Sequence, residues 1–219
     1  MKKRIVKILL SSLMVSLSAP ILPTTCEKTG HDSYIYLPKE EVIDVDEIDD
    51  KYIDINKKIK LAIENINKKL EEINNIENLK DWFAAYKCLI EDYSYILDSP
   101  ETIYDYYTDE ELTLLFRVVQ AEVGDEYTFE QKVNVVSVIF NRIEHEDFPN
   151  EMLDILAKDQ FQPISDGRYK EIEVSNETVL ACEYSFMFRD TTNGCLFFDS
   201  NGKLKYEFVY SDGAHNFYR

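Results

Sequence analysis

The stretch Gln120–Gln131, QAEVGDEYTFEQ, separates two apolar segments and decides how the C-terminal half of the chain is organised. Before it, leucine, phenylalanine and valine recur at helical spacing from residue 112 to residue 119. After it, apolar residues lie almost all round the helix predicted over about 128–143, so this second helix is expected inside its domain. Gly124 is a typical helix terminator, so Glu122 is expected in the last turn of the first helix.

Glu122 is a candidate catalytic acid because of this position. Contact with apolar neighbours disfavours the charged carboxylate, and so does the negative end of a helix dipole. Both effects raise a carboxyl pKa, which a general acid needs in order to keep its proton near neutral pH. On these local grounds alone, an ordinary solvated glutamate at a helix end remains the alternative.

Charge and composition exclude one class of partner. The chain has 219 residues with 45% hydrophobic content, enough for a folded core, and its formal net charge is −18. An acidic surface of this size repels phosphate backbones, so we predict that the protein does not bind nucleic acid.

The N-terminal residues 1–19 are typical of a signal peptide. A basic segment up to Lys7 precedes an apolar run over Ile8–Leu17 and small residues suited to cleavage, Ser16 to Ala19. The apolar run is short for a membrane span. We therefore predict a secreted or wall-associated protein, with a retained N-terminal membrane anchor as the alternative.

Two further segments precede the C-terminal domain. Residues 20–50 are interrupted by prolines and end in an acidic run, which favours a disordered linker. Residues 51–100 predict a helical hairpin or coiled-coil stalk with a break at Asn74-Asn75, because isoleucine and leucine recur at spacings of three and four. The 51–97 helices could pair two copies, so we consider a homodimer.

Residues 101–219 predict an α+β domain that is mainly helical. Thr108 or Asp109 is the expected N-cap of the first helix, and Ser175 to Arg189 predicts a later one. Two short apolar runs, 194–198 and 207–210, indicate strands joined by a hairpin turn around Asn201-Gly202. A small sheet is thus expected beside the helices.

The C-terminal half resembles the spore-cortex-lytic, or cell wall hydrolase, family over about residues 111–219. The segments that carry the resemblance occur in the family's order: Ala121-Glu122-Val-Gly-Asp-Glu126 followed by Gln131, Val138-Ile-Phe-Asn-Arg142, Phe148-Pro149-Asn150, Gln160-Phe161-Gln-Pro-Ile-Ser-Asp166-Gly167-Arg168, and Gly194-Cys-Leu-Phe-Phe198 with Gly213-Ala-His215-Asn-Phe217-Tyr218. The chain departs from the family's pattern at Gly124-Asp125, where Arg-Gly is usual, and at Tyr127 and Glu130.

This resemblance implies a lysozyme-like domain that cleaves peptidoglycan glycan strands with Glu122 as the single catalytic acid, as a lytic transglycosylase does. It also implies a substrate-binding set: Glu126, Gln160, Phe161, Asp166, Arg168, His215 and Tyr218. If water rather than the sugar's own hydroxyl attacks, a second carboxylate is required, and Glu126 and Asp166 are the candidates. No metal or other cofactor is expected.

Other functions are weaker matches to the sequence. Cys182 and Cys195 lie in apolar segments, which suits buried thiols or a mutual disulfide better than a cysteine nucleophile. The three histidines are scattered, so no zinc-ligand spacing is present. The main alternative is a secreted, non-catalytic interaction protein whose hydrolase domain has lost activity.

Overall fold

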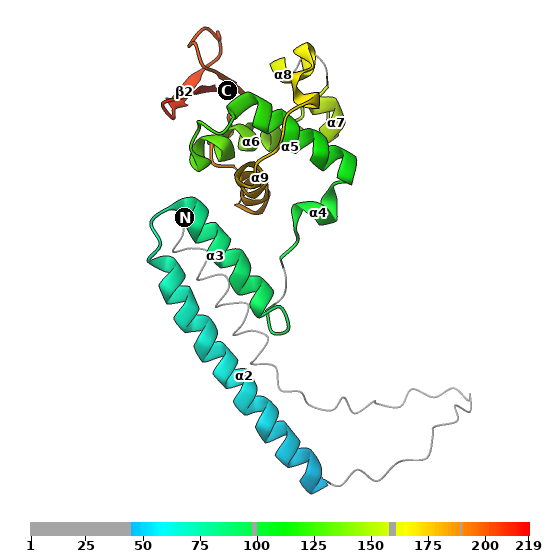
Figure 1. Cartoon of the computed structure of the whole chain (residues 1–219), viewed down its shortest axis with the longest axis vertical. Helices are drawn as coiled ribbons and strands as arrows, with labels where there is room; N and C mark the ends of the chain where they lie inside the picture. The colour runs from blue at the N-terminus through cyan, green and yellow to red at the C-terminus, as the bar shows by residue number, and fades with distance from the viewer. Residues whose placement is uncertain (1–44, 98–99, 158–160, 189) are drawn as a thin grey trace, which may run out of the picture. The chain divides into compact units, whose positions relative to one another are not determined.

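The computed structural model describes residues 45–97, 100–157, 161–188 and 190–219, drawn as the coloured ribbon in Figure 1. The chain forms two compact units, one of residues up to 75 with 88–98, the other of 76–87 with 99–219. The predicted signal peptide and most of the predicted linker lie outside the described residues. No helix among the described residues is long and apolar enough to cross a membrane.

The first unit is built on α2 (Val45–Asn74) and the last part of α3 (Leu79–Asp92). The predicted apolar seam is confirmed, because Ile66, Leu70 and Ile73 are buried. The predicted break at Asn74-Asn75 is also confirmed. The helix begins at Val45 rather than at residue 51, and the acidic run before residue 51 contains no proline or glycine that would end it.

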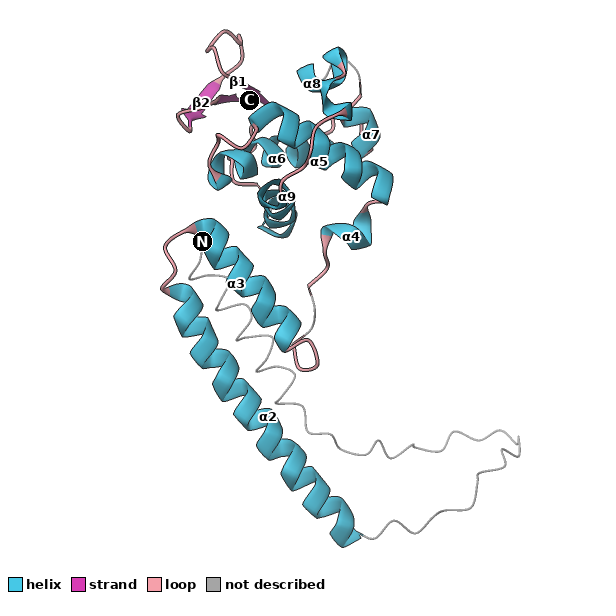
Figure 2. Ribbon diagram, viewed as in Figure 1, coloured by secondary structure: helices cyan, strands magenta, loops and turns pink. Residues whose placement is uncertain are grey.

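The second unit is mainly helical, as Figure 2 shows. Its elements after α3 are α4 (Ile103–Tyr106), α5 (Asp109–Val123), α6 (Phe129–Glu144), α7 (Met152–Ile155), α8 (Gln162–Asp166), the 3-10 turn η1 (Arg168–Lys170) and α9 (Asn176–Phe188). The core of this unit is formed by α5, α6 and α9 with the short α7. Most of α6 is buried between its neighbours, as the apolar residues almost all round it predict.

Capping boxes fix where α5 and α6 begin. The hydroxyl of Thr108 accepts a hydrogen bond from the backbone N–H of Glu111, whose carboxylate accepts one from the N–H of Thr108 at 2.8 Å. Thr128 and Gln131 make the same reciprocal pair at the start of α6. Each box satisfies backbone donors that the first helical turn would leave unpaired.

The small sheet has the order β1-β3-β2, with β1 (Phe197–Asp199) and β2 (Phe208–Ser211) both antiparallel to β3 (Asn216–Tyr218). The predicted hairpin is therefore wrong, because the two predicted strands never pair with each other and the unpredicted β3 lies between them. Asn201-Gly202 instead belongs to a turn whose N–H groups bond to the carboxylate of Asp199.

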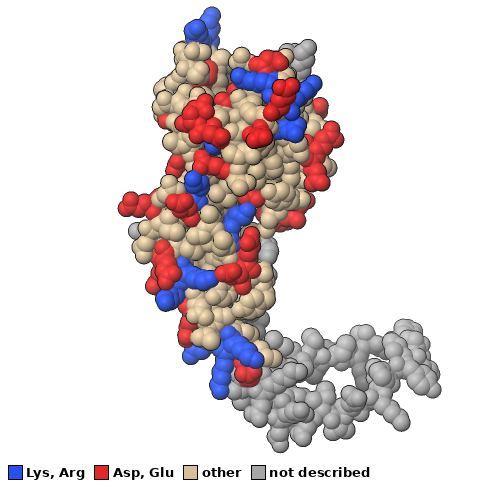
Figure 3. All heavy atoms as spheres, viewed as in Figure 1, with Lys and Arg blue, Asp and Glu red and all other residues tan. Residues whose placement is uncertain are grey.

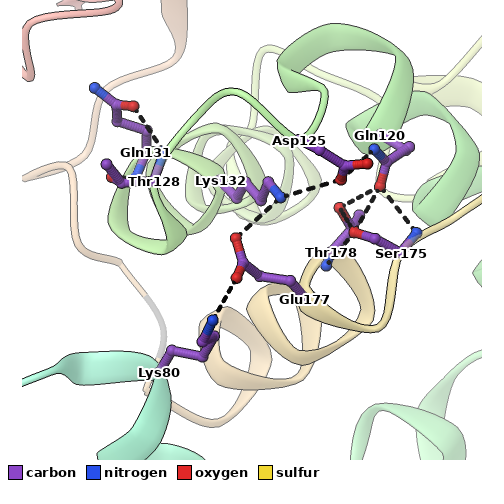
Figure 4. Close-up of polar contacts among 9 residues, drawn as sticks. All are labelled: Lys80, Gln120, Asp125, Thr128, Gln131, Lys132, Ser175, Glu177 and Thr178. Atoms are coloured by element: carbon purple, nitrogen blue, oxygen red, sulfur yellow. Dashed lines mark hydrogen bonds and ion pairs between the residues drawn. The ribbon is translucent and has the colours of Figure 1, made fainter.

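A polar network on one side of α5 holds the loop that follows Glu122 (Figure 4). The buried Gln120 side chain accepts hydrogen bonds from the N–H of Ser175 and the hydroxyl of Thr178, and donates one to Asp125 at 2.9 Å. The side chain of Lys132, 1% exposed, lies 3.1 Å from Glu177. The network thus joins the start of α9 to the loop between α5 and α6.

The cysteines carry no disulfide within the described residues. Cys182 in α9 and Cys195 are buried free thiols, and Cys88 is an exposed one. Burial raises the pKa of the Cys182 thiol, so it lacks the thiolate that a cysteine nucleophile requires.

Replacing Gly124 with alanine is expected to destabilise the protein by about 1–3 kcal/mol, since φ +59° with ψ −170° is a backbone conformation that only glycine adopts readily. Urea unfolding measures the change. The new methyl group would also meet the flexible carboxylate of Glu126. The double variant Gly124→Ala, Glu126→Ala is the control: if it recovers wild-type stability, the cost comes from that contact and the backbone explanation is wrong.

Candidate active site

A cleft of about 390 Å³ opens beside the C-terminal turn of α5. Segments distant in the sequence form its walls: the end of α5, the start of α8, η1, and the turn after β1. Its lining residues are Glu122, Tyr127, Arg142, Phe161, Gln162, Arg168, Phe198, Asp199, Ser200, Asn201 and His215. The cleft therefore combines an acid and two arginines with aromatic rings.

Glu122 is half-buried in this cleft, and its pKa is raised above the usual glutamate value. Burial is the main cause, and the negative charge of Asp166 acts in the same direction. The charge of Arg168, a hydrogen bond from the backbone N–H of Gln162 and the charge of Arg142 partly oppose it. The carboxyl group thus tends to hold its proton, while the two arginines favour the anion once the proton has left.

Arg142 is the most unusual charged group of the cleft, because its side chain is almost wholly buried at 7% exposure. Its Nε donates to the backbone carbonyl of Leu196 at 2.6 Å. Its guanidinium lies 5.2–5.5 Å from the ring centres of Phe148, Phe161 and Phe197. Nη1 is buried and has no hydrogen-bond partner among the described residues.

Desolvation by these rings lowers the pKa of Arg142 to about 10, so the group stays charged at neutral pH, and Tyr206 and Glu122 oppose the shift. A buried cation is costly unless another group compensates for its lost water. The faces of aromatic rings supply part of that compensation, and a nearby carboxylate supplies more. Arg142 therefore stabilises the ionised form of Glu122.

Arg168 is the second cation of the cleft and is less buried. Its Nε lies 3.7 Å from a carboxylate oxygen of Asp166, whose other oxygen accepts the Arg168 backbone N–H at 3.1 Å. Gly167 lies between these two residues and ends α8 in a left-handed conformation, with φ +81°. Asp166 acts on Glu122 by its charge but does not line the cleft.

Asp199 is the other carboxylate of the cleft wall, and its oxygens are occupied by hydrogen bonds. It accepts bonds from the N–H groups of Gly202 and Lys203 and from the hydroxyl of Tyr218 at 3.0 Å. Burial alone would raise the pKa of Asp199, but these donors outweigh burial and lower it. Asp199 is thus an anion that holds the turn at the cleft rim.

His215 lies buried between aromatic rings of the cleft wall. Its ring stacks on Tyr127 at 5.4 Å between centres and meets Phe198 edge to face at 5.3 Å. Burial lowers the pKa of His215, against the opposing charges of Asp212 and Asp199, so the ring is neutral at neutral pH. Its Nδ1 is buried without a hydrogen-bond partner among the described residues.

The structure brings together four of the residues predicted from sequence: Glu122, Phe161, Arg168 and His215 line the same cleft. Tyr218 is buried behind the cleft wall and supports Asp199 rather than lining the cleft. The exposed Glu126 does not line the cleft either, and Gln160 lies outside the described residues.

Sequence reasoning missed Arg142, Asp199 and the rim residues Ser200 and Asn201 as parts of the site. Arg142 ends one of the segments that resemble the family, but it was not assigned to the site, because an arginine at the end of a helix usually reaches solvent. Asp199 follows an apolar strand, and only the fold brings it near Glu122. No group of histidine, cysteine and acidic side chains in the described part of the chain is arranged to hold a metal ion.

Comparison with known families adds to this geometry. The model of the cell wall hydrolase family matches residues 127–218. This segment is therefore similar to the cell wall hydrolase family. The match spans less than half of the chain and includes Arg142, Arg168, Asp199 and His215, but it begins after Glu122.

Two solved structures are similar to part of the chain. The catalytic domain of the Bacillus cereus SleB protein matches with 19% identity and a TM-score of 0.47, over 52% of this chain and 92% of that chain. The catalytic domain of the germination-specific lytic transglycosylase SleB from Bacillus anthracis matches with 18% identity and a TM-score of 0.48, over 53% of this chain and all of that one. No curated protein sequence matches the chain.

Replacing Glu122 with glutamine is expected to stabilise the protein increasingly as pH rises. Because the pKa of Glu122 is raised in the folded state, the folded protein binds the proton more tightly, and stability falls as pH rises through the window above the usual glutamate pKa. Glutamine has no proton to lose. Thermal unfolding between about pH 4 and about pH 8 measures the difference.

The exposed Glu126, four residues away, provides the control variant Glu126→Gln. A difference between Glu122→Gln and wild type that stays constant across this pH range would show that the carboxyl is not shifted by burial.

Proposed function

We propose that the hydrolase domain cleaves the glycan strands of peptidoglycan at the bond between N-acetylmuramic acid and N-acetylglucosamine, with Glu122 as the catalytic acid. The observation that carries the proposal is a half-buried carboxyl with a raised pKa, facing a cleft that contains two arginines and several aromatic rings. The similarity of residues 127–218 to the cell wall hydrolase family supports the substrate class.

In the first step, protonated Glu122 donates its proton to the glycosidic oxygen as the bond to the muramyl carbon breaks. Positive charge develops on the sugar in an oxocarbenium-like transition state. At the same time the Glu122 carboxyl becomes an anion, and Arg142 and Arg168 lower the free energy of that anion. The arginines thus act where charge forms during the reaction.

In the second step, the Glu122 carboxylate accepts the proton of the muramyl 6-hydroxyl, whose oxygen closes a 1,6-anhydro ring on the same sugar. Glu122 recovers its proton and no water is consumed. The position of the carboxylates supports this route over hydrolysis. Asp199, which lines the cleft with Glu122, is held by hydrogen bonds, while the predicted partner acids Glu126 and Asp166 lie outside the cleft lining.

We also propose that the protein reaches this substrate by export through its N-terminal segment. The basic and apolar pattern of residues 1–19 supports export, and the retained membrane anchor is the alternative. Pairing of two copies through the 51–97 helices stays a prediction.

Glu122→Gln is expected to lower the rate of peptidoglycan cleavage by at least about 100-fold, because it removes the transferable proton and leaves the shape of the site unchanged. The loss of turbidity of purified peptidoglycan measures the rate. Glu126→Gln is the matched control and should keep most of the activity, since Glu126 lies outside the cleft. Equal rates for wild type and Glu122→Gln would favour the non-catalytic interaction protein instead.

Mass spectrometry of the released fragments separates the two routes. Anhydro ends are lighter than reducing ends by one water molecule. Reducing ends alone would contradict the ring-closing step and would require an acid that activates water.

Arg142→Met is expected to move the falling, alkaline limb of the pH–rate profile to higher pH. The positive charge of Arg142 lowers the pKa of Glu122, so its removal lets the acid keep its proton further up the pH scale, and the maximal rate falls. Arg142→Lys keeps the charge and should keep the limb near its wild-type position. A limb that does not move in Arg142→Met would show that the two groups are not coupled.

A further inference from the structure

The outer face of the three-stranded sheet carries aromatic side chains that the cleft does not use. The strand register aligns Phe197, Tyr218 and Phe208 in one row across β1, β3 and β2. Backbone pairing continues beyond β2 through Glu207 and Arg219. Tyr206 lies in a bend just before β2, and its ring reaches this row because it stacks on the ring of Phe197.

Two of these rings are exposed although they are supported from below. Tyr206 stacks on Phe197 with 3.9 Å between ring centres and an angle of 4°, yet it is 50% exposed. Phe208 meets Tyr218 edge to face at 5.9 Å and is 57% exposed. Each ring is held in place while much of its surface stays in water. Adjacent exposed rings of this kind mark a binding surface more often than isolated ones do.

The aromatic face continues directly from the cleft. The guanidinium of Arg142, which lines the cleft, lies 5.5 Å from the centre of the Phe197 ring on which Tyr206 stacks. Asp199 also lines the cleft and lies two residues after Phe197 on β1. Its carboxylate accepts a hydrogen bond from the hydroxyl of Tyr218. A polymer that leaves the cleft over Asp199 therefore passes onto this face.

The charge of the neighbouring loop suits a carboxylate-bearing polymer. Acidic side chains are spread over the surface in Figure 3, in keeping with the net charge of −18. The loop between β1 and β2 carries two exposed cations, Lys203 and Lys205, against one exposed acid, Glu207, and Figure 3 shows a basic group at the outer end of this loop. The peptide stems of peptidoglycan carry carboxylates, which these cations attract.

We propose that Tyr206 and Phe208 form a second binding site for the glycan strand, outside the cleft, on which sugar rings stack beyond the bond that is cleaved. The aromatic faces contact the apolar C–H faces of the sugars, and Lys203 and Lys205 contact the peptide carboxylates. The identification of the ligand as a glycan strand rests on the proposed function. It retains the long insoluble substrate while the cleft acts on one bond.

The test measures binding rather than cleavage, in the full chain carrying Glu122→Gln, by co-sedimentation with insoluble peptidoglycan. Adding Tyr206→Ala and Phe208→Ala is expected to raise the dissociation constant about tenfold, as the loss of two ring contacts predicts. Tyr206→Phe with Phe208→Tyr keeps both rings and should bind normally. Tyr95→Ala removes an exposed tyrosine from the first unit and is the matched control.

A second measurement uses the active chain with a short soluble glycan of four sugars, which occupies the cleft alone. The Phe208→Ala variant should cleave this glycan at the wild-type rate while its action on whole peptidoglycan falls, since the Phe208 ring contacts Tyr218 rather than a residue of the cleft lining. If the double variant fails to fold, Phe208→Ala alone tests the more exposed ring.

Unchanged binding to peptidoglycan in the folded variants would overturn the proposal, and so would a change limited to self-association of the protein. These outcomes are distinct from failure of the proposed function, because the binding assay does not depend on cleavage. Failure of the proposed function would instead appear as cleavage that survives Glu122→Gln.

Discussion

The amide of Gln120 is the interaction on which the rest of the site depends. Its oxygen accepts hydrogen bonds from the beginning of α9, through Ser175 and Thr178, and its nitrogen donates to Asp125 in the loop after α5. A buried amide that uses both its acceptor and its donor fixes two segments relative to each other. Glu122 follows two residues later, so its direction is determined by a group that never touches the cleft.

The electrostatics of the cleft arise from opposing effects on one carboxyl group. Burial favours the protonated form of Glu122, and Arg142 and Arg168 favour the anion. An acid that must release and recover a proton needs both effects. A pKa shifted far in one direction would make one of the two proton transfers difficult. The aromatic surroundings of Arg142 strengthen its effect, since they exclude the water that would screen its charge.

Local signals predicted the helices of the second unit well. Thr108, Thr128 and Gly124 act through neighbours within four residues, so their roles in starting or ending α5 and α6 could be read from the sequence. The sheet was harder, because pairing with β3 depends on residues far along the chain. For the same reason Asp199 could not be assigned to the site: its partner Tyr218 and its neighbour Glu122 are distant in sequence.

The strand order has a consequence for how the protein matures. Since β1 and β2 pair only with β3 in this sheet, neither can be completed before residues 216–218 have left the ribosome. The helices, in contrast, rest mainly on contacts made earlier in synthesis. The cleft wall that contains Asp199 is therefore completed after the helices, so the cleft does not form until the polypeptide has been made through β3.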